Sequence, residues 1–247
     1  QHVWAGVSRA QRAPSVTDRD LRLILAVAAG PMLPVVVGHF SNPTYDDERL
    51  VQTEAGYRVQ IGRQAAIDAT VFHGRYEGLP TYEPLEPAVE LAPHPHLLVG
   101  TSLDSLLRAR ASGLEVSGRW QPRSRLEFSG WYAFLRMTAR VDAASLDLLS
   151  AAAAENVPAH QWRVQSAYRI RPDVQVSASA ARTGRLAAVP AHTRVDARAE
   201  IRLERRLTAT IVGQNLLDPR HAEFTTGYLS TTSSVPRSAR IDLRWEF

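Results

Sequence analysis

The last segment of the chain, residues 239–247, alternates strictly between apolar and charged side chains. The apolar set and the charged set interleave as Ala239, Arg240, Ile241, Asp242, Leu243, Arg244, Trp245, Glu246 and Phe247. Because successive side chains of a β-strand point to opposite faces, a strand here has one apolar face and one charged face. A helix would mix the two sets on each face, so the alternation predicts a strand. Residues 194–204 repeat the pattern.

Weaker copies of this alternation recur along the whole sequence. Leu126, Phe128 and Tyr132, for example, alternate with a set that includes Arg125 and Glu127. Several copies reach the roughly 9–11 residues that a tilted strand needs to cross a bilayer. The pattern predicts about ten strands, at 2–10, 51–62, 65–77, 106–120, 124–138, 160–171, 174–183, 193–204, 206–214 and 236–247.

The predicted connections alternate between short and long. Tight turns are expected at 62–64, 121–124, 171–173 and 205–206, and long connections at 11–49, 78–100, 139–159, 184–192 and 215–235. Outer-membrane barrels have this layout, with short periplasmic turns and long extracellular loops. The sequence therefore predicts an all-β fold, an antiparallel transmembrane β-barrel that ends on the periplasmic side. The run Ala151–Ala154 predicts a short helix within one loop.

Aromatic residues favour a membrane barrel over the alternative fold, a soluble β-sandwich with one wet face. Amphipathic rings collect at both membrane interfaces of a barrel, whereas a sandwich gives no reason for such sorting. The rings here lie near the predicted turn ends and loop ends of strands: Trp120, Tyr168, Trp245 and Phe247 at the former, Phe134 and Trp162 at the latter.

Composition excludes several other classes of protein. The longest apolar region, residues 21–37, is interrupted by Arg22, Gly30, Pro31 and Pro34, so a membrane-spanning helix is not expected. Cysteine is absent, which excludes disulfides and thiolate metal sites. The net charge of +4 comes from arginine that alternates with Asp and Glu, so nucleic acid is not expected as a partner.

Motifs at both ends of the sequence resemble those of TonB-dependent outer-membrane receptors. The C-terminal part carries Val212-Gly213-Gln214-Asn215-Leu216-Leu217-Asp218, then His221-Ala222-Glu223-Phe224, Val235-Pro236-Arg237-Ser238 and Trp245-Glu246-Phe247. The N-terminal part carries Val7–Ser15 with Asp18-Arg19-Asp20-Leu21, and Glu54-Ala55-Gly56-Tyr57-Arg58. Each motif alone is weak, whereas their order and spacing together are specific.

The resemblance implies that residues 1–247 are one receptor barrel domain, the C-terminal strands of a larger barrel of about 22 strands. It implies a Gram-negative outer-membrane location and contacts with lipid, with a plug domain and with the TonB complex. The plug and the TonB-contacting segment are not among these residues, so this piece alone is not expected to transport. The terminal Trp245 and Phe247 resemble the signal that the barrel-assembly machinery reads.

Candidate ligand-binding residues lie in the predicted extracellular loops. Tyrosine, histidine and arginine side chains there suit an anionic iron chelate: Tyr45, Tyr82, His94, His96, Arg185, His192, Arg220, His221 and Tyr228. For any single residue, ordinary polar loop surface is the competing interpretation. His94 and His96 have no third ligand in the sequence, so no metal site or cofactor is predicted. Motifs for hydrolysis or phosphate binding are missing, so no enzyme is expected.

Three functional hypotheses follow from these residues and this resemblance. The first is a receptor that actively imports a scarce ligand, a ferric siderophore or other iron complex. Haem or a vitamin is the alternative ligand in the same family, with His39 between Arg12-Ala13-Pro14 and Asn42-Pro43 as the haem candidate. The second hypothesis is a passive porin or structural barrel, and the third is a soluble β-sheet binding module.

Overall fold

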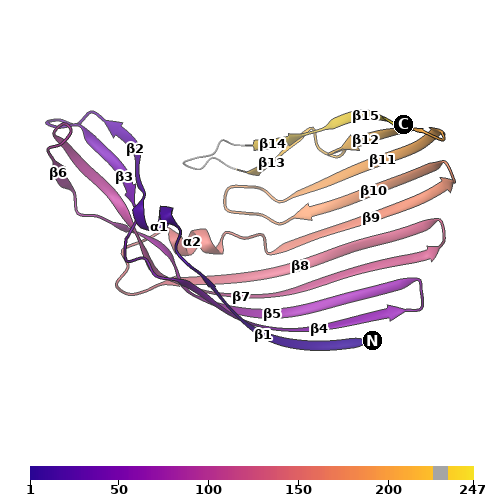
Figure 1. The fold of residues 1–247 in the computed structure, drawn as a ribbon, viewed down its shortest axis with the longest axis horizontal. Coiled ribbons are helices and arrows are strands. Elements are labelled where there is room, and N and C mark those ends of the chain that lie inside the picture. The colour runs from indigo at the N-terminus through magenta and orange to yellow at the C-terminus, as the bar shows by residue number, and fades with distance from the viewer. Residues whose placement is uncertain (225–232) are drawn as a thin grey trace.

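The computed structural model describes residues 1–224 and 233–247 and consists almost entirely of β-strands (Figure 1). Its main sheet follows the order β1-β4-β5-β7-β8-β9-β10-β11-β12-β15, with antiparallel pairing along the whole path. These strands are β1 (His2–Arg12), β4 (Glu48–Ile61), β5 (Ala65–Pro84), β7 (His96–Arg123), β8 (Leu126–Val141), β9 (His160–Arg171), β10 (Val174–Thr183), β11 (His192–Glu204), β12 (Leu207–Gln214) and β15 (Ser238–Trp245). Each strand predicted from the sequence corresponds to one strand of this path, so the predicted fold class is confirmed.

Short turns lie at one end of the sheet, together with both chain termini (Figure 1). They join β4 to β5, β7 to β8, β9 to β10 and β11 to β12. Gly62 in the first turn has φ +57°, a left-handed conformation that glycine adopts without steric cost. The long connections lie at the opposite end. The predicted alternation of short and long connections is therefore confirmed.

Cross-strand register arranges the side chains in rows, which gives the sheet two chemically different faces. One row on the apolar face runs over successive partners Ile241, Ile211, Ala199, Val176, Tyr168 and Leu126. The adjacent row, on the other face, runs over Asp242, Thr210, Glu200, Gln175 and Arg169. Ile241 is 70% exposed and Ile211 48%. A half-exposed apolar row of this extent suits contact with lipid rather than water.

Two strands extend beyond their predicted bounds, which corrects the expected loop at 78–100. β5 continues to Pro84 and β7 begins at His96. The predicted strand ended at residue 77, directly before Gly78, a residue type that commonly marks a turn. Gly78 instead has φ +70° and lies at a shift of register between Tyr76 and Leu79, which is a β-bulge that the strand passes through.

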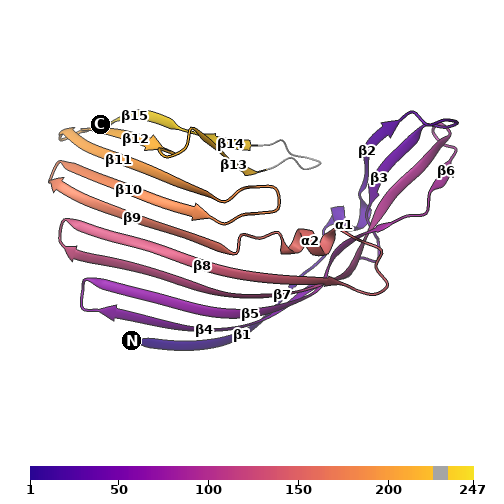
Figure 2. The same cartoon turned by 180° about the vertical axis from the view of Figure 1, so that it is seen from behind.

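The predicted connection 11–49 also contains regular structure. α1 (Val16–Asp20) precedes the hairpin of β2 (Arg22–Ala28) and β3 (Val35–Phe40). β3 pairs in parallel with the extended part of β7, and β6 (Ala88–Glu90) pairs with the same strand. These strands form a lobe that projects from the loop end of the sheet (Figure 2). We call β2, β3, β6 and the start of β7 the projecting lobe.

The remaining long connections add smaller elements. α2 (Ser150–Glu155) confirms the predicted helix at Ala151–Ala154, and its alanines pack on the buried cluster of Leu107, Ala109 and Ala139. β13 (Arg220–Phe224) and β14 (Ser233–Pro236) form a separate antiparallel pair within 215–235. Among the residues described, neither helix is long and apolar enough to cross a membrane.

Candidate functional site

The predicted ligand-binding residues that the structure describes lie in the long connections or at the strand ends that border them, and they do not form one cluster. Tyr45 lies deepest, with 1% of its surface exposed. Its hydroxyl donates to Glu48 Oε1 at 3.2 Å, and its backbone carbonyl accepts from Arg19 at 3.2 Å. Burial and the neighbouring Glu48 carboxylate raise the pKa of Tyr45. These contacts give Tyr45 a packing role where the projecting lobe joins the sheet.

A network of ion pairs beside Tyr45 holds the end of β1 in place. Arg12 lies between Asp18 at 3.0 Å and Glu48 at 2.5 Å, so it joins β1, α1 and β4. Ser15 caps α1: Asp18 N–H donates to Ser15 Oγ, while Ser15 N–H donates to Asp18 Oδ2 at 2.8 Å. The backbone hydrogen bond from Ser15 lowers the pKa of Asp18. The motif around residues 12–18 therefore forms a rigid strand-to-loop junction.

Tyr82 lies on the extension of β5 with about half of its surface exposed. Its ring meets His39 edge-on, with 4.8 Å between centroids. His39 Nδ1 lies 3.1 Å from Thr101 Oγ1, and burial lowers the pKa of His39. The backbone N–H of Tyr82 donates to Asp147 at 2.7 Å, which holds the loop before α2 against β5.

His94 and His96 do not converge on a common ligand position. His96 Nδ1 lies 2.8 Å from the backbone oxygen of His94, and His96 Nε2 lies 3.3 Å from Glu90. Glu90 also pairs with Arg22 at 2.6 Å. Both histidines line an open apolar pocket of the projecting lobe, together with Ile24, Val27, Val36 and a run of prolines.

Three of the predicted residues do meet, at the start of β11 and β13. His192, Arg220 and His221 line one open pocket with Pro190, Leu217 and Asp218. Arg185 lies in the loop 184–191 that precedes β11. The prediction for Tyr228 lies outside the described residues.

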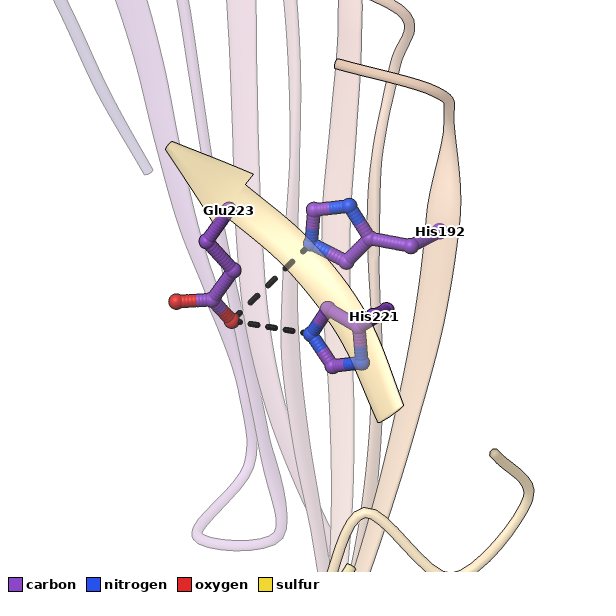
Figure 3. Close-up of side chains that lie close together, drawn as sticks. All are labelled: His192, His221 and Glu223. Carbon is purple, nitrogen blue, oxygen red and sulfur yellow. Dashed lines mark hydrogen bonds and ion pairs between the residues drawn. The ribbon is translucent and has the colours of Figure 1, made fainter. Parts of the chain in front are cut away.

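His192 and His221 are joined by Glu223, which the sequence analysis did not select (Figure 3). His221 Nε2 lies 3.0 Å from Glu223 Oε1, and His192 Nε2 lies 4.0 Å from the same oxygen. The two imidazole rings stack with centroids 4.4 Å apart and an angle of 17° between their planes. One potential ligand atom from each residue lies within 4.8 Å of the others. The spacing of His221 and Glu223, two apart on a strand, is the signal that could have found this pair.

The C-terminal residues lie at the turn end, far from these groups along the strands (Figure 1). Trp245 ends β15 with 59% of its surface exposed, and Phe247 is fully exposed. Their position agrees with the predicted periplasmic end of the chain, while their role in assembly stays a prediction.

Several solved structures share this fold. The chain superposes on the ferric enterobactin receptor PfeA in complex with BCV-L6 with a TM-score of 0.72 at 14% identity, covering 99% of this chain and 38% of that one. The siderophore receptor PirA from Acinetobacter baumannii gives 0.70 at 12% identity, covering 99% and 39%. The copper transporter OprC gives 0.65 at 15% identity, covering 99% and 37%. The chain thus spans less than two-fifths of the length of these structures.

Comparison of the sequence with known families identifies the family of this chain. A search of curated proteins found no match. A family model described as "TonB dependent receptor-like, beta-barrel" matches residues 1–216, most of the chain. Proteins of this family are outer-membrane receptors and transporters rather than enzymes. The chain belongs to the TonB-dependent receptor β-barrel family.

Proposed function

We propose that this chain forms part of the barrel wall of an outer-membrane receptor that imports a scarce ligand, a ferric siderophore or another iron complex. The family match over residues 1–216 carries this proposal. It favours an active importer over a passive porin, because the matched family consists of receptors. The sheet with one apolar and one charged face supports a barrel wall between lipid and a polar interior.

Arginines on the apolar face indicate where the lipid-facing band ends toward the loops. Val71 and Leu114 are partners within the apolar band. Four residues further along β5 and β7 on the same face, Arg75 lies opposite Arg110, and Arg108 lies opposite Arg140 on the next strand pair. Like charges that face each other repel, and they would be costly within hydrocarbon. We therefore place the upper limit of the lipid-facing band below these arginines.

The loop-end chemistry supports an anionic iron chelate as the ligand. Arg220, at the start of β13, lines an open pocket, and Arg185 lies in the loop before β11. Guanidinium groups bind carboxylate oxygens with good geometry. The solved structures with this fold include siderophore receptors. By this proposal the remaining partners are outer-membrane lipid, the plug, the TonB complex and the barrel-assembly machinery.

Uptake measurements test the proposal directly. Cells that depend on the full-length protein are grown under iron limitation and offered radiolabelled iron with catecholate or hydroxamate chelators. Accumulation that stops when TonB is deleted would support the importer, and iron limitation should raise expression. Uptake of small solutes that persists without TonB would instead indicate a porin. Growth on haem or a vitamin, with no response to chelated iron, would assign the alternative ligand.

Arg220→Gln tests the contribution of the pocket. It should lower iron uptake several-fold while leaving the amount of protein in the outer membrane unchanged. Arg169→Gln, on the charged face of β9, is the matched control and should have little effect.

A further inference from the structure

His192, His221 and Glu223 gather at a point where the chain changes direction, and their hydrogen bonds fix which atoms face inward. Asn215, fully buried, donates from Nδ2 to the backbone oxygen of Val235 at 3.0 Å. Its Oδ1 therefore faces His221 Nδ1 at 3.2 Å, and this nitrogen must carry the proton of that hydrogen bond. The lone pair of the neutral imidazole then lies on Nε2, which faces Glu223.

A hydrogen bond at Nδ1 orients the His192 ring in the same way. Its Nδ1 faces the backbone oxygen of Pro190 at 3.4 Å, which leaves Nε2 as the electron-pair donor. Each ring thus directs an unprotonated nitrogen toward one carboxylate oxygen of Glu223, at 3.0 Å and 4.0 Å. Three electron-pair donors that face one another need a cation between them. A proton can satisfy one of these contacts, whereas a metal ion satisfies all three.

Burial and solvent access favour the metal. The side chains of His192 and His221 are only 12% and 7% exposed, so little water can reach their inward-facing nitrogens. Arg194, two residues further along β11, donates a hydrogen bond to Asp196 at 2.9 Å, and the Glu223 carboxylate acts on it only as a neighbouring charge. The Glu223 side chain is 43% exposed, which leaves a route from solvent.

Two imidazoles and a carboxylate select the class of ion. Calcium and magnesium prefer oxygen ligands, whereas zinc and its neighbours in the first transition row accept this mixed set. Bonds of about 2.0–2.2 Å at tetrahedral angles place ligand atoms roughly 3.3 Å apart. The His221–Glu223 distance of 3.0 Å already fits, and the His192–Glu223 distance is 4.0 Å. The three ligand atoms lie within 4.8 Å of one another, so metal binding requires the stacked rings to turn and their nitrogens to close by up to about 1.5 Å. The open pocket beside both rings leaves room for a fourth ligand.

We propose that His192, His221 and Glu223 bind a divalent transition-metal ion, Zn²⁺ or a close relative, on the wall of the barrel. Such an ion joins β13 to the start of β11 and clips the β13–β14 hairpin to the sheet (Figure 3). Asn215 acts as a positioning residue, because it orients the His221 ring through Nδ1. This inference does not depend on which ligand the receptor imports.

Metal titration of the full-length protein, purified from membranes after chelation, tests the proposal. Calorimetry with Zn²⁺ should show one site per chain, and Co²⁺ should give the visible absorption of a four-coordinate nitrogen and oxygen site. Glu223→Gln should weaken Zn²⁺ binding at least tenfold without disturbing the fold, because this side chain is partly exposed. His192→Ala and His221→Ala should each abolish the Co²⁺ spectrum.

His2→Ala is the matched control, since it removes an exposed histidine of β1 and should leave the titration unchanged. Failure of Zn²⁺ to bind would overturn the proposal and leave His221 and Glu223 as an ordinary ion pair. Unchanged Zn²⁺ binding in Glu223→Gln would also overturn it. Neither readout requires transport, so the result is independent of the test for iron uptake.

Discussion

Replacing Ile211 by arginine tests the assignment of the two faces of the sheet. Ile211 lies in the middle of β12, between Ile241 and Ala199 in one apolar row, with no carboxylate in that row. An arginine on the lipid face near the bilayer midplane costs roughly 2–4 kcal/mol. The folding equilibrium should therefore fall by roughly 30-fold to 1,000-fold, at about 1.4 kcal/mol per factor of ten.

Thr210→Arg is the matched control, one residue away on the opposite face. Thr210 lies between Glu200 and Asp242 in its row, so an arginine there gains two carboxylate neighbours. Exposed pairs of this kind contribute about 0–1 kcal/mol, so stability should hardly change.

Urea-dependent folding of the full-length protein into lipid vesicles measures both variants, with tryptophan fluorescence as the signal. Ile211→Arg should shift the midpoint to lower urea, while Thr210→Arg stays near the parent. Equal losses in both variants, or a greater loss for Thr210→Arg, would refute the assignment of lipid to the apolar row.

Four further predictions concern individual contacts. Gly62→Ala should destabilise the protein by roughly 1–2 kcal/mol in urea unfolding, because alanine is strained at a φ of +57°. No atom lies within 4 Å of the added Cβ, so the backbone conformation is the only source of this cost. Gly62→Asn should destabilise the protein less, because asparagine tolerates this conformation better than alanine. Burial opposes ionisation of the Asp147 carboxyl, but hydrogen bonds from Ser150 and from backbone N–H groups outweigh burial and lower the pKa of Asp147. The ionised carboxylate therefore stabilises the fold at neutral pH, and this stabilisation is lost as the pH falls through the lowered folded-state pKa. Acidification should therefore expose residues 142–155 to an acid-active protease, and Asp147→Asn should expose them at neutral pH. Tyr45→Phe should cost about 1 kcal/mol in the same urea assay through loss of the bond to Glu48, and a cost of zero would show that this buried hydroxyl contributes nothing. Phe247→Ala should lower the amount of protein in isolated outer membranes if the terminal ring is read during assembly, whereas an unchanged amount would remove that role.

The sheet was predictable because lipid on one side and polar groups on the other impose a period of two on each strand. Ile241 and Ile211 show this, since their places in the sequence alone decide which face they occupy. The extension of β5 past Gly78 was not predictable, because a glycine with positive φ serves equally in a bulge and in a turn. Only the pairing with β7 separates these cases.

The group of His192, His221 and Glu223 was only partly visible in the sequence. The two histidines were selected as loop residues, each by itself. Their stacking depends on how β13 folds back beside the start of β11, which Asn215 fixes with its left-handed backbone at φ 52° and its buried side-chain amide. Contacts of this kind join residues far apart in the chain, so no local pattern contains them. Tyr45 shows the reverse case, since a ring expected in a surface loop is 1% exposed and bonds to Glu48 and Arg19, a burial that no local pattern predicted.

The β2–β3 hairpin of the projecting lobe lies in the connection between β1 and β4, two strands that remain paired to their ends. Register between β1 and β4 continues without a break up to Arg12 and Glu48, which close the base of this connection with an ion pair. The hairpin of β2 and β3 pairs with the sheet through β7, and His39 of β3 also contacts Tyr82 of β5. Residues 19–41 therefore leave the β1–β4 pair and return to it at one place. With the proposed orientation, shortening this segment or exchanging it for that of a relative would change the outer surface of the receptor while the β1–β4 register stays intact.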